Sequence, residues 1–440
     1  MSGSGSSHAI VLGAGIAGML TARVLSDHVE RVTLVERDPL DQDGPRRGVP
    51  QARHLHGLLD RGRTIMEELY PGLTAQAAAL GAPTAEALLG TRWYLGGLRV
   101  RPTPTGLTSL MATRPLLESV IRERTLTIPG IALRDRTAAR ALVGTARAVT
   151  GVVVSRDDEE RTLRADLVVD ATGRASRAPD WLRALGVAPP AEDRVDVDLG
   201  YASRFYRRSP GQLDDHSSVI ISTGPNGRGG GAIRVEHDRW HVTLAGMLGD
   251  HPPIDRAGFA EFASTLAAPD IHEIVTAAEP LDDGVPHRFR HSVRRRYERT
   301  AAPITGFLAV GDAVCSFNPL YAQGMSVAAQ QALALRDCLA AGTSDLPSRF
   351  YAEAGRVVDV AWQMSTGSDL RYPGVVGDRT ARIRLTNAYV GAAHRAAHTD
   401  ARVARTFLRV ANLVEPPAAL LRPALAGRIL LPGRRNNDDR

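Results

Sequence analysis

The sequence contains no lysine, so all 54 of its basic residues are arginine. This absence excludes a Walker A phosphate-binding loop, which needs its lysine, and enzymes that form a Schiff base through lysine, including those that use pyridoxal phosphate. Against 48 acidic residues the formal net charge is +6. The arginines alternate with acidic residues instead of forming one basic block, so we expect no nucleic-acid partner.

Cysteine is also scarce: the sequence contains only Cys315 and Cys338. There is no CxxC pair, no zinc-type spacing and no set of cysteines for a disulfide framework, which favours a cytoplasmic protein without a metal site. No apolar run reaches the ~18 residues that a membrane-spanning helix needs. The segment Met1–His8 also lacks the basic and apolar parts of a signal peptide. We therefore expect no transmembrane segment.

A length of 440 residues, of which 43% are hydrophobic, exceeds what one core usually fills. Low hydrophobicity and high net charge are both missing, which excludes disorder over most of the chain. We expect two domains, interleaved along the sequence.

The first motif that carries chemistry lies near the N-terminus. A short apolar strand at Ala9–Leu12 runs into Gly13-Ala14-Gly15-Ile16-Ala17-Gly18, then a helix over Met19–Leu25 and a strand over Arg31–Glu36. This order and length are those of a Rossmann βαβ unit, whose glycines allow a tight turn, a close approach of phosphates and close helix packing. An acid at the end of the second strand, here Glu36, accepts hydrogen bonds from the adenosine ribose. The unit predicts binding of FAD or NAD in preference to NADP.

A later segment favours FAD. Gly306–Asp312 reads as a buried strand that ends at an acid, and Pro319–Ser326 leads into a helix over Gly324–Leu339. An acid at a strand end can bind the ribityl hydroxyls of FAD. The glycine-containing turn brings backbone N–H groups and the positive end of a helix to the pyrimidine edge of the flavin.

Together with Asp170-Ala171-Thr172-Gly173-Arg174, these segments resemble the three fingerprints of FAD-dependent monooxygenases of the aromatic-hydroxylase fold, over roughly residues 8–345. The Ala-Thr-Gly form of the middle motif is similar to that of squalene-epoxidase-like and geranylgeranyl-reductase-like relatives. Two longer segments, Arg47–His56 and Phe317–Met325, resemble bacterial polyether-pathway flavin epoxidases of the monensin and lasalocid type.

The resemblance implies an α/β fold: a glutathione-reductase-like Rossmann FAD domain, an inserted antiparallel β-sheet substrate domain and a helical C-terminal region. We place the discontinuous FAD domain at residues 1–75, 108–190 and 290–345. The substrate domain takes 76–107 and 191–289, and the C-terminal helical region takes 346–440.

The predicted site residues follow from the same motifs. The expected cofactor-binding residues are Gly13, Ala14, Gly15, Gly18, Glu36, Arg37, Arg47, Arg114, Asp312, Pro319, Gly324 and Met325. Tyr201, Phe205 and Phe317 are expected to contact the substrate. No protein side chain is assigned as catalytic, because the flavin carries the chemistry, and no metal is expected.

The implied activity is that of an FAD-dependent monooxygenase. With dioxygen, reduced flavin would form a flavin hydroperoxide that epoxidises an alkene of a lipophilic secondary metabolite, such as a polyene, polyketide or terpenoid. NADPH or a partner flavin reductase would supply the electrons. Two alternatives stay open: an aromatic ring hydroxylase of the same fold, and a geranylgeranyl-reductase-like enzyme that uses no oxygen. A halogenase is disfavoured, because the sequence has no Trp-x-Trp-x-Ile-Pro segment and no lysine.

Some further residues invite an interpretation. His54 and His56 would share one face if they lay on a strand. We expect them to pack in a loop or at the flavin edge and not to bind a metal. Arg294–Arg296 is expected to be a solvated face or to pair with Glu298. For the proline-broken stretch Leu413–Leu431 we favour packing on its own domain over capping the substrate cleft, touching a membrane or contacting another subunit.

Overall fold

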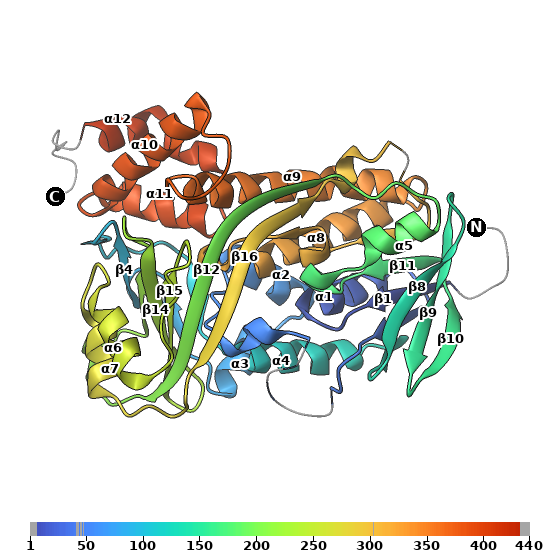
Figure 1. Ribbon diagram of the computed structural model, residues 1–440, viewed down its shortest axis with the longest axis horizontal. Helices are drawn as coiled ribbons and strands as arrows, with labels where there is room; N and C mark the ends of the chain where they lie inside the picture. The colour runs from blue at the N-terminus through green and yellow to red at the C-terminus, as the bar shows by residue number, and fades with distance from the viewer. Residues whose placement is uncertain (1–6, 41–43, 45, 47, 302, 432–440) are drawn as a thin grey trace.

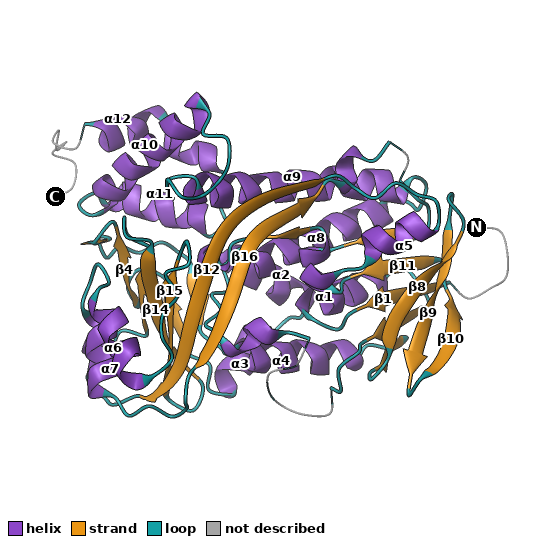
Figure 2. Cartoon of the chain, in the orientation of Figure 1, coloured by secondary structure: helices purple, strands orange, loops and turns teal. Residues whose placement is uncertain are grey.

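The fold is taken from a computed structural model, which describes residues 7–40, 44, 46, 48–301 and 303–431. Two large sheets, the helices that flank them and a group of C-terminal helices form most of the described structure (Figures 1 and 2). The α/β fold with a Rossmann domain, a second sheet and a helical C-terminal region is confirmed.

The first sheet is the parallel sheet of the Rossmann domain, in the order β17-β11-β1-β2-β7. Its strands are β1 (His8–Leu12), β2 (Arg31–Val35), β7 (Ile131–Arg134), β11 (Leu167–Asp170) and β17 (Phe307–Ala309). The apolar runs of β1 and β11 are buried along almost their whole length, as expected for parallel strands covered on both faces. Since β17 pairs with β11, a segment near residue 308 completes a sheet that begins at residue 8.

Helices and a small antiparallel sheet accompany this parallel sheet. The helices are α1 (Ile16–Leu25), α2 (Asp60–Leu69), α3 (Leu73–Ala79), α4 (Arg114–Leu126), α5 (Ala178–Ala184) and α8 (Gly324–Ala340). The small sheet consists of β8 (Ala138–Gly144), β9 (Val149–Arg156) and β10 (Glu159–Arg164). Helix α4 begins at Arg114, because the Thr113 hydroxyl accepts a hydrogen bond from the N–H of Leu116 and Pro115 occupies the first turn.

The second sheet is larger and runs in the order β18-β16-β12-β15-β14-β13-β4-β5. Its strands are β4 (Thr91–Leu95), β5 (Leu98–Arg99), β12 (Glu192–Arg207), β13 (Ser218–Ile221), β14 (Arg228–Val235), β15 (Arg239–Gly246), β16 (Val285–Arg295) and β18 (Cys315–Ser316). The pairings are antiparallel as expected, apart from β13 and β4, which pair in parallel. The long strands β12 and β16 run from this sheet toward the Rossmann domain (Figure 1).

The other elements flank the large sheet. The short strands β3 (Thr84–Glu86) and β6 (Thr108–Leu110) pair with each other, and α6 (Arg256–Ser264) and α7 (Asp270–Ala277) pack on the sheet. Trp240 is fully buried in that core. The chain ends in α9 (Leu346–Asp369), α10 (Ala381–Ala397), α11 (Ala401–Ala411) and α12 (Pro423–Leu430), of which the last three lie above β4 in Figure 1. No helix in the described ranges is long and apolar enough to cross a membrane.

The expected solvated face at Arg294–Arg296 is wrong for Arg294, whose side chain is 1% exposed. Its guanidinium donates to Glu298 at 2.8 Å and to Asp359 of α9 at 2.5 Å. The predicted pairing with Glu298 is confirmed, but inside the protein. A planar guanidinium with several donors suits this position, because two carboxylates can be bonded at once.

Arg294→Ala should lower the free energy of unfolding by about 3 kcal/mol, because it removes a fully buried side chain together with its bonds to Glu298 and Asp359. Arg161→Ala is the matched control: the Arg161–Glu159 pair is 71% and 72% exposed, and such pairs contribute less than about 1 kcal/mol. Denaturant unfolding of the three proteins measures both effects. Equal losses for the two variants would contradict the buried network.

Candidate functional site

A cavity of about 2320 Å³ lies between the Rossmann domain, the large sheet and the C-terminal helices. Pockets for one drug-sized ligand usually hold about 300–1,000 Å³. The cavity therefore has room for a dinucleotide and a second molecule. Its wall includes the glycine turn after β1, the loop before α8, and residues from β4, β13 and α10.

The glycine turn after β1 is built as the sequence predicts. Gly13 has a φ of 97°, and a Cβ there would lie 2.5 Å from the carbonyl oxygen of Ala171. A Cβ on Gly18 would lie 1.9 Å from the carbonyl oxygen of Gly13, so α1 can approach the turn only with glycine at this position. Gly13 and Gly15 line the cavity. Since no side chain caps α1, its first N–H groups are free to bind phosphate.

Ala14 and Gly18, two of the predicted cofactor contacts, do not line the cavity. Ala14 is buried, and its N–H donates to Glu36 Oε2 at 2.8 Å. Gly18 faces the turn and is needed for packing. Both residues stabilise the conformation of the glycine turn, but neither forms part of the cavity wall.

Glu36 belongs to a buried network of alternating charges. Arg46 lies 3.1 Å from Glu36 and 2.7 Å from Glu118, and Arg114 bonds the other oxygen of Glu118 at 2.8 Å. Burial alone would raise the pKa of Glu118, but Arg114 and Arg46 hold it below its ordinary value. Burial would likewise lower the pKa of Arg46, which Glu118 and Glu36 raise. The network therefore keeps Glu118 and Arg46 ionised at the nucleotide end of the cavity.

Of the predicted arginines, Arg114 lines the cavity, and so does Arg37 although it is exposed. Arg47 lies outside the described residues. Its neighbour Arg46, absent from the predicted set, also lines the cavity and joins Glu36 to Glu118. The two adjacent arginines were the available signal, but the sequence alone does not show that Arg46 lines the cavity.

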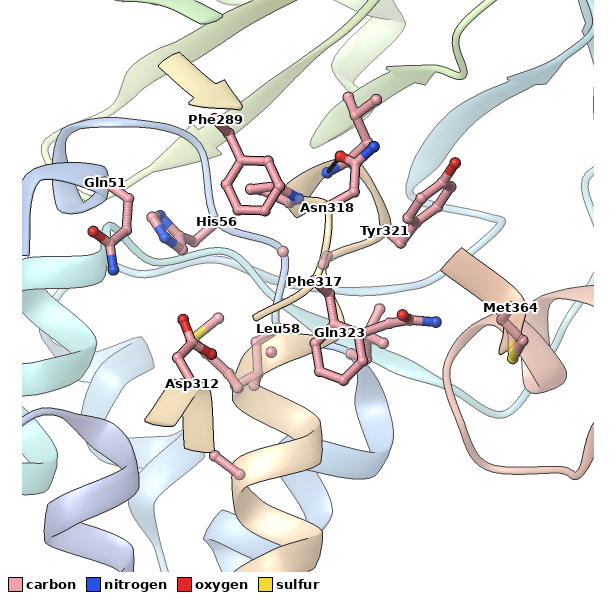
Figure 3. A pocket seen from close by; sticks show the side chains of 18 of the residues that line it. Gln51, His56, Leu58, Phe289, Asp312, Phe317, Asn318, Tyr321, Gln323 and Met364 are labelled. Carbon is pink, nitrogen blue, oxygen red and sulfur yellow. Dashed lines mark hydrogen bonds between the residues drawn. The ribbon is translucent and has the colours of Figure 1, made fainter. Parts of the chain in front are cut away.

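The predicted flavin end gathers residues from the segment between β17 and α8 and from the start of α8. Asp312, Pro319, Gly324 and Met325 all line the cavity, and Figure 3 shows Asp312, Leu58 and Phe317 in its wall. In the described part of the chain the Asp312 carboxylate has no hydrogen-bond partner. Burial raises its pKa, while Arg114 and Arg174 act to lower it. This carboxylate is available for the hydroxyl groups of a ribityl chain.

The loop before α8 is held from the other side by α9. The Asn318 side-chain amide and the Tyr321 hydroxyl both donate to Asp369 Oδ1, each at 2.8 Å. Asp369 is buried at the end of α9, and burial raises the pKa of its carboxyl group to about 6, although Tyr321 and Asn318 counteract the shift. One carboxyl group thus fixes the loop that carries Pro319.

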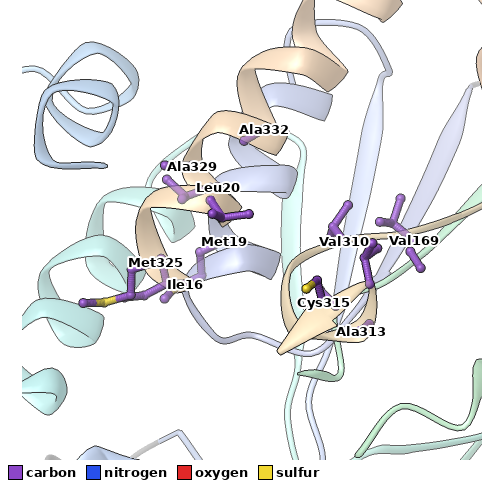
Figure 4. Close-up of a cluster of buried hydrophobic side chains, with 14 of the residues drawn as sticks. Ile16, Met19, Leu20, Val169, Val310, Ala313, Cys315, Met325, Ala329 and Ala332 are labelled. Carbon is purple, nitrogen blue, oxygen red and sulfur yellow. The ribbon is translucent and has the colours of Figure 1, made fainter. Parts of the chain in front are cut away.

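Below this loop, α1 and α8 pack against each other (Figure 4). Ile16, Met19 and Ala329 contribute buried side chains to this contact. Helix α8, like α1, starts without a side-chain cap. The packing therefore presents the free N–H groups of two helix starts to the same cavity.

At the predicted substrate end, Tyr201 and Phe317 line the cavity but Phe205 does not. Phe205 stacks on His241 at 4.2 Å between ring centroids and is covered by the Arg239 guanidinium at 4.5 Å. The alternation along β12 correctly places Tyr201 and Phe205 on one face. Further along the strand, however, that face is covered by side chains of β15.

His54 and His56 lie in a loop after the short 3-10 helix Pro50–Arg53, not on a strand. Both line the cavity. His54 Nδ1 is 2.7 Å from Ser203 Oγ, and His56 Nδ1 is 2.8 Å from the His54 carbonyl. Burial lowers the pKa of His54 to about 3 and that of His56 to about 4, so both rings are neutral.

The C-terminal stretch packs on α10 and α11, as favoured from the sequence, and also walls the cavity. Pro417, Ala418, Leu420, Leu421 and Leu430 line it. The expectation that Leu413–Leu431 only packs on its own domain is therefore incomplete, because the stretch also forms part of the cavity wall.

Comparisons with known proteins agree with this geometry. Residues 6–345 match the family described as FAD binding domain, and the chain belongs to that family. It is 32% identical to Protein Rv3254 of Mycobacterium tuberculosis, over 94% of this chain and 91% of that protein. It is 26% identical to kynurenine 3-monooxygenase of Salinispora arenicola, covering 82% and 80% of the two chains. The structure of p-nitrophenol 4-monooxygenase PnpA from Pseudomonas putida shares the fold, with a TM-score of 0.67, 15% identity, and coverage of 94% and 99%.

The protein is thus an FAD-dependent oxidoreductase of the monooxygenase class, which confirms the predicted class and its FAD cofactor. The residues present fit FAD. Gly13 and Gly15 leave room for a pyrophosphate, Glu36 directly follows β2, and the Asp312 carboxylate has no hydrogen-bond partner among the described residues.

Gly18→Ala should weaken FAD binding by about a hundredfold, equivalent to about 3 kcal/mol, because the added methyl group collides with the Gly13 carbonyl and forces the turn open. The matched control is Gly427→Ala on α12, where a Cβ meets nothing within 4 Å. Titration of each apoprotein with FAD, followed by flavin fluorescence, measures the affinities. Unchanged binding in Gly18→Ala would be evidence against the close approach.

Asp369→Asn should become increasingly stabilising as pH rises. The pKa of Asp369 is raised to about 6 in the folded protein, whereas the unfolded chain releases this proton near pH ~4. The free energy of unfolding of the wild type therefore decreases as the pH rises from about 4 to about 6 and stays low above that. The amide keeps an acceptor oxygen for Asn318 and Tyr321 but cannot ionise, and the gain over wild type should reach roughly 3 kcal/mol at about pH 7.

Denaturant unfolding across this pH range tests the prediction for Asp369. Asp157→Asn is the control, because Asp157 is 89% exposed and its positive φ tolerates asparagine. A pH-independent difference between Asp369→Asn and wild type would show that Asp369 is not protonated in the folded protein.

Proposed function

We propose that this protein inserts one oxygen atom from dioxygen into a lipophilic secondary metabolite, with alkene epoxidation of a polyene, polyketide or terpenoid as the primary reaction. The observation that carries the proposal is the extent of the cavity. It continues from the nucleotide turn to the space between β4, β13 and α10, where Trp93, Ile220 and Val390 contribute to its wall. Bound FAD would supply the activated oxygen.

The exposed apolar side chains support a lipophilic substrate. Leu385 is 73% exposed, Leu421 61% and Leu430 60%, and all three also line the cavity. Apolar groups that are at once exposed and part of a cavity wall suit the entry of an apolar molecule. The resemblance of Phe317–Met325 to polyether-pathway epoxidases points in the same direction.

The chain's own residues would position the reactants and exclude water. Asp312 would bind the ribityl hydroxyls, and the N–H groups at the start of α8 would face the pyrimidine edge of the flavin. Phe317 and the C-terminal stretch would close the cavity around the substrate. The residue ranges of the FAD domain, the substrate domain and the C-terminal region, as given from the sequence, remain part of the proposal. The proposed electron source is NADPH or a partner flavin reductase, and the proposed location is the cytoplasm.

Ring hydroxylation is the second candidate, favoured by the relatives named kynurenine 3-monooxygenase. It would use the same oxygen donor and the same cavity. A reductase that uses no oxygen, the other alternative from the sequence, is disfavoured by these monooxygenase relatives.

The test is turnover of the purified holoprotein with isotopically labelled dioxygen. The substrates are linear polyenes and alkyl phenols, with either NADPH or photoreduction as electron source. The expected product is a polyene epoxide that carries one labelled oxygen, and mass spectrometry identifies it. The same protein stripped of FAD should give no labelled product. Labelled catechols from the phenols alone would establish hydroxylation, and saturated products without label would establish a reductase.

A further inference from the structure

Three aromatic rings from separate segments meet in the cavity wall. They belong to His54 in the loop after Pro50–Arg53, Tyr201 on β12 and His287 on β16, and all three line the cavity. Ring centroids lie 5.9 Å apart for His54 and Tyr201, 5.2 Å for His54 and His287, and 6.3 Å for Tyr201 and His287. The register of the sheet pairs Tyr201 directly with His287.

Two polar atoms of this cluster are buried without a partner. Neither His54 Nε2 nor the Tyr201 hydroxyl has a hydrogen bond within the part of the chain that the structure describes. Leaving a buried polar atom unpaired costs free energy, and native proteins rarely do so twice in one place. Both rings line the cavity, which has room for a substrate beside the dinucleotide. A substrate can therefore supply the hydrogen-bond partner that these two atoms lack.

A chain of hydroxyl groups leads to the His54 ring. The N–H of Leu55 donates to Thr243 Oγ1 at 3.0 Å, and Thr243 Oγ1 lies 2.6 Å from Ser203 Oγ. Ser203 Oγ is in turn 2.7 Å from His54 Nδ1. Either hydroxyl of the Ser203–Thr243 pair can be the donor. We assign the Thr243 hydroxyl as the donor to Ser203 and the Ser203 hydroxyl as the donor to His54 Nδ1, because each hydroxyl then has an acceptor. This assignment places the proton of the neutral ring on Nε2.

Both free groups are consequently neutral donors. Burial lowers the pKa of His54, with His287, His56 and Arg53 adding to the effect, so the ring stays uncharged. Burial and the charge of Asp369 raise the pKa of Tyr201, so its hydroxyl keeps its proton. Burial also lowers the pKa of His287, and Arg174 adds to this. Two neutral donors side by side suit an uncharged oxygen with two lone pairs and no proton of its own.

We propose that His54 Nε2–H and the Tyr201 hydroxyl bind a carbonyl oxygen of the substrate, and that the substrate is a ketone, enone or quinone instead of a pure hydrocarbon. The inference rests on the proposed function, because it names the substrate class of the same cavity. His54 and Tyr201 act as positioning residues, and Ser203 and Thr243 act through His54.

The first test compares acetylnaphthalene with isopropenylnaphthalene, in which a methylene group replaces the carbonyl oxygen. Binding to the oxidised holoprotein is followed by the change in flavin absorbance, without turnover. Wild type should bind the ketone about tenfold more tightly. Tyr201→Phe and His54→Leu should each reduce this preference to about threefold or less and leave the affinity for the hydrocarbon unchanged.

Two variants serve as controls for this test. His54→Gln keeps a donor N–H and should retain most of the preference, whereas Phe205→Leu on the same face of β12, outside the cavity wall, should retain all of it. Equal affinities of wild type for the two probes, or an unchanged preference in Tyr201→Phe, would overturn the proposal. Preference for naphthol over both probes would replace the carbonyl with a phenolic oxygen and would overturn it equally.

The second test needs no ligand. Nitrogen NMR of protein labelled at histidine distinguishes the two neutral tautomers, and we expect wild-type His54 to be protonated at Nε2 only. Ser203→Ala should allow the proton to move to Nδ1. A wild-type ring protonated at Nδ1, or charged near neutral pH, would overturn the proposal even if no probe binds. Oxygen insertion into hydrocarbons without any preference for ketones would overturn it and leave the proposed function intact.

Discussion

The parallel pairing of β1 with β2 and β11, and of β11 with β17, is the constraint on which the rest of the structure depends. Because parallel strands end at one edge of their sheet, Gly13, Glu36, Asp170 and Asp312 meet there although they are far apart in the sequence. The edge is held by backbone bonds: the Gly13 N–H donates to Val35, and the Val310 N–H donates to Asp170. Without this register the glycine turn and the loop before α8 would not face one cavity.

The absence of lysine has a structural counterpart inside the protein. Arg46 bridges two buried carboxylates, and the buried guanidinium of Arg294 bridges Glu298 and the half-exposed Asp359. A guanidinium group offers several donors in a fixed plane and is less strongly hydrated than an ammonium group, so it suits such positions. Arginine is thus used here to join segments that are distant in the chain.

Local patterns predicted the parts of the site that local sequence builds. The glycine turn, the acid at the end of β2 and the start of α8 each depend on residues within one supersecondary unit, and all three were found from their spacing. Phe205 shows where this reasoning ends, because its exposure depends on Arg239 and His241 of a neighbouring strand. The bridge made by Arg46 and the burial of Arg294 against Asp359 were not predicted for the same reason: Glu118 and Asp359 come from other elements.

Asp369 has a consequence for how the two ends of the cavity communicate. It closes α9 and bonds Asn318 and Tyr321, while the next residues lead into the segment that Arg379 holds through the carbonyls of Leu370, Tyr372 and Val375. The end of α9, the segment that Arg379 holds and the loop that carries Pro319 are therefore connected through Asp369. While this carboxyl group bonds Asn318 and Tyr321, the loop and the end of α9 cannot move independently of each other.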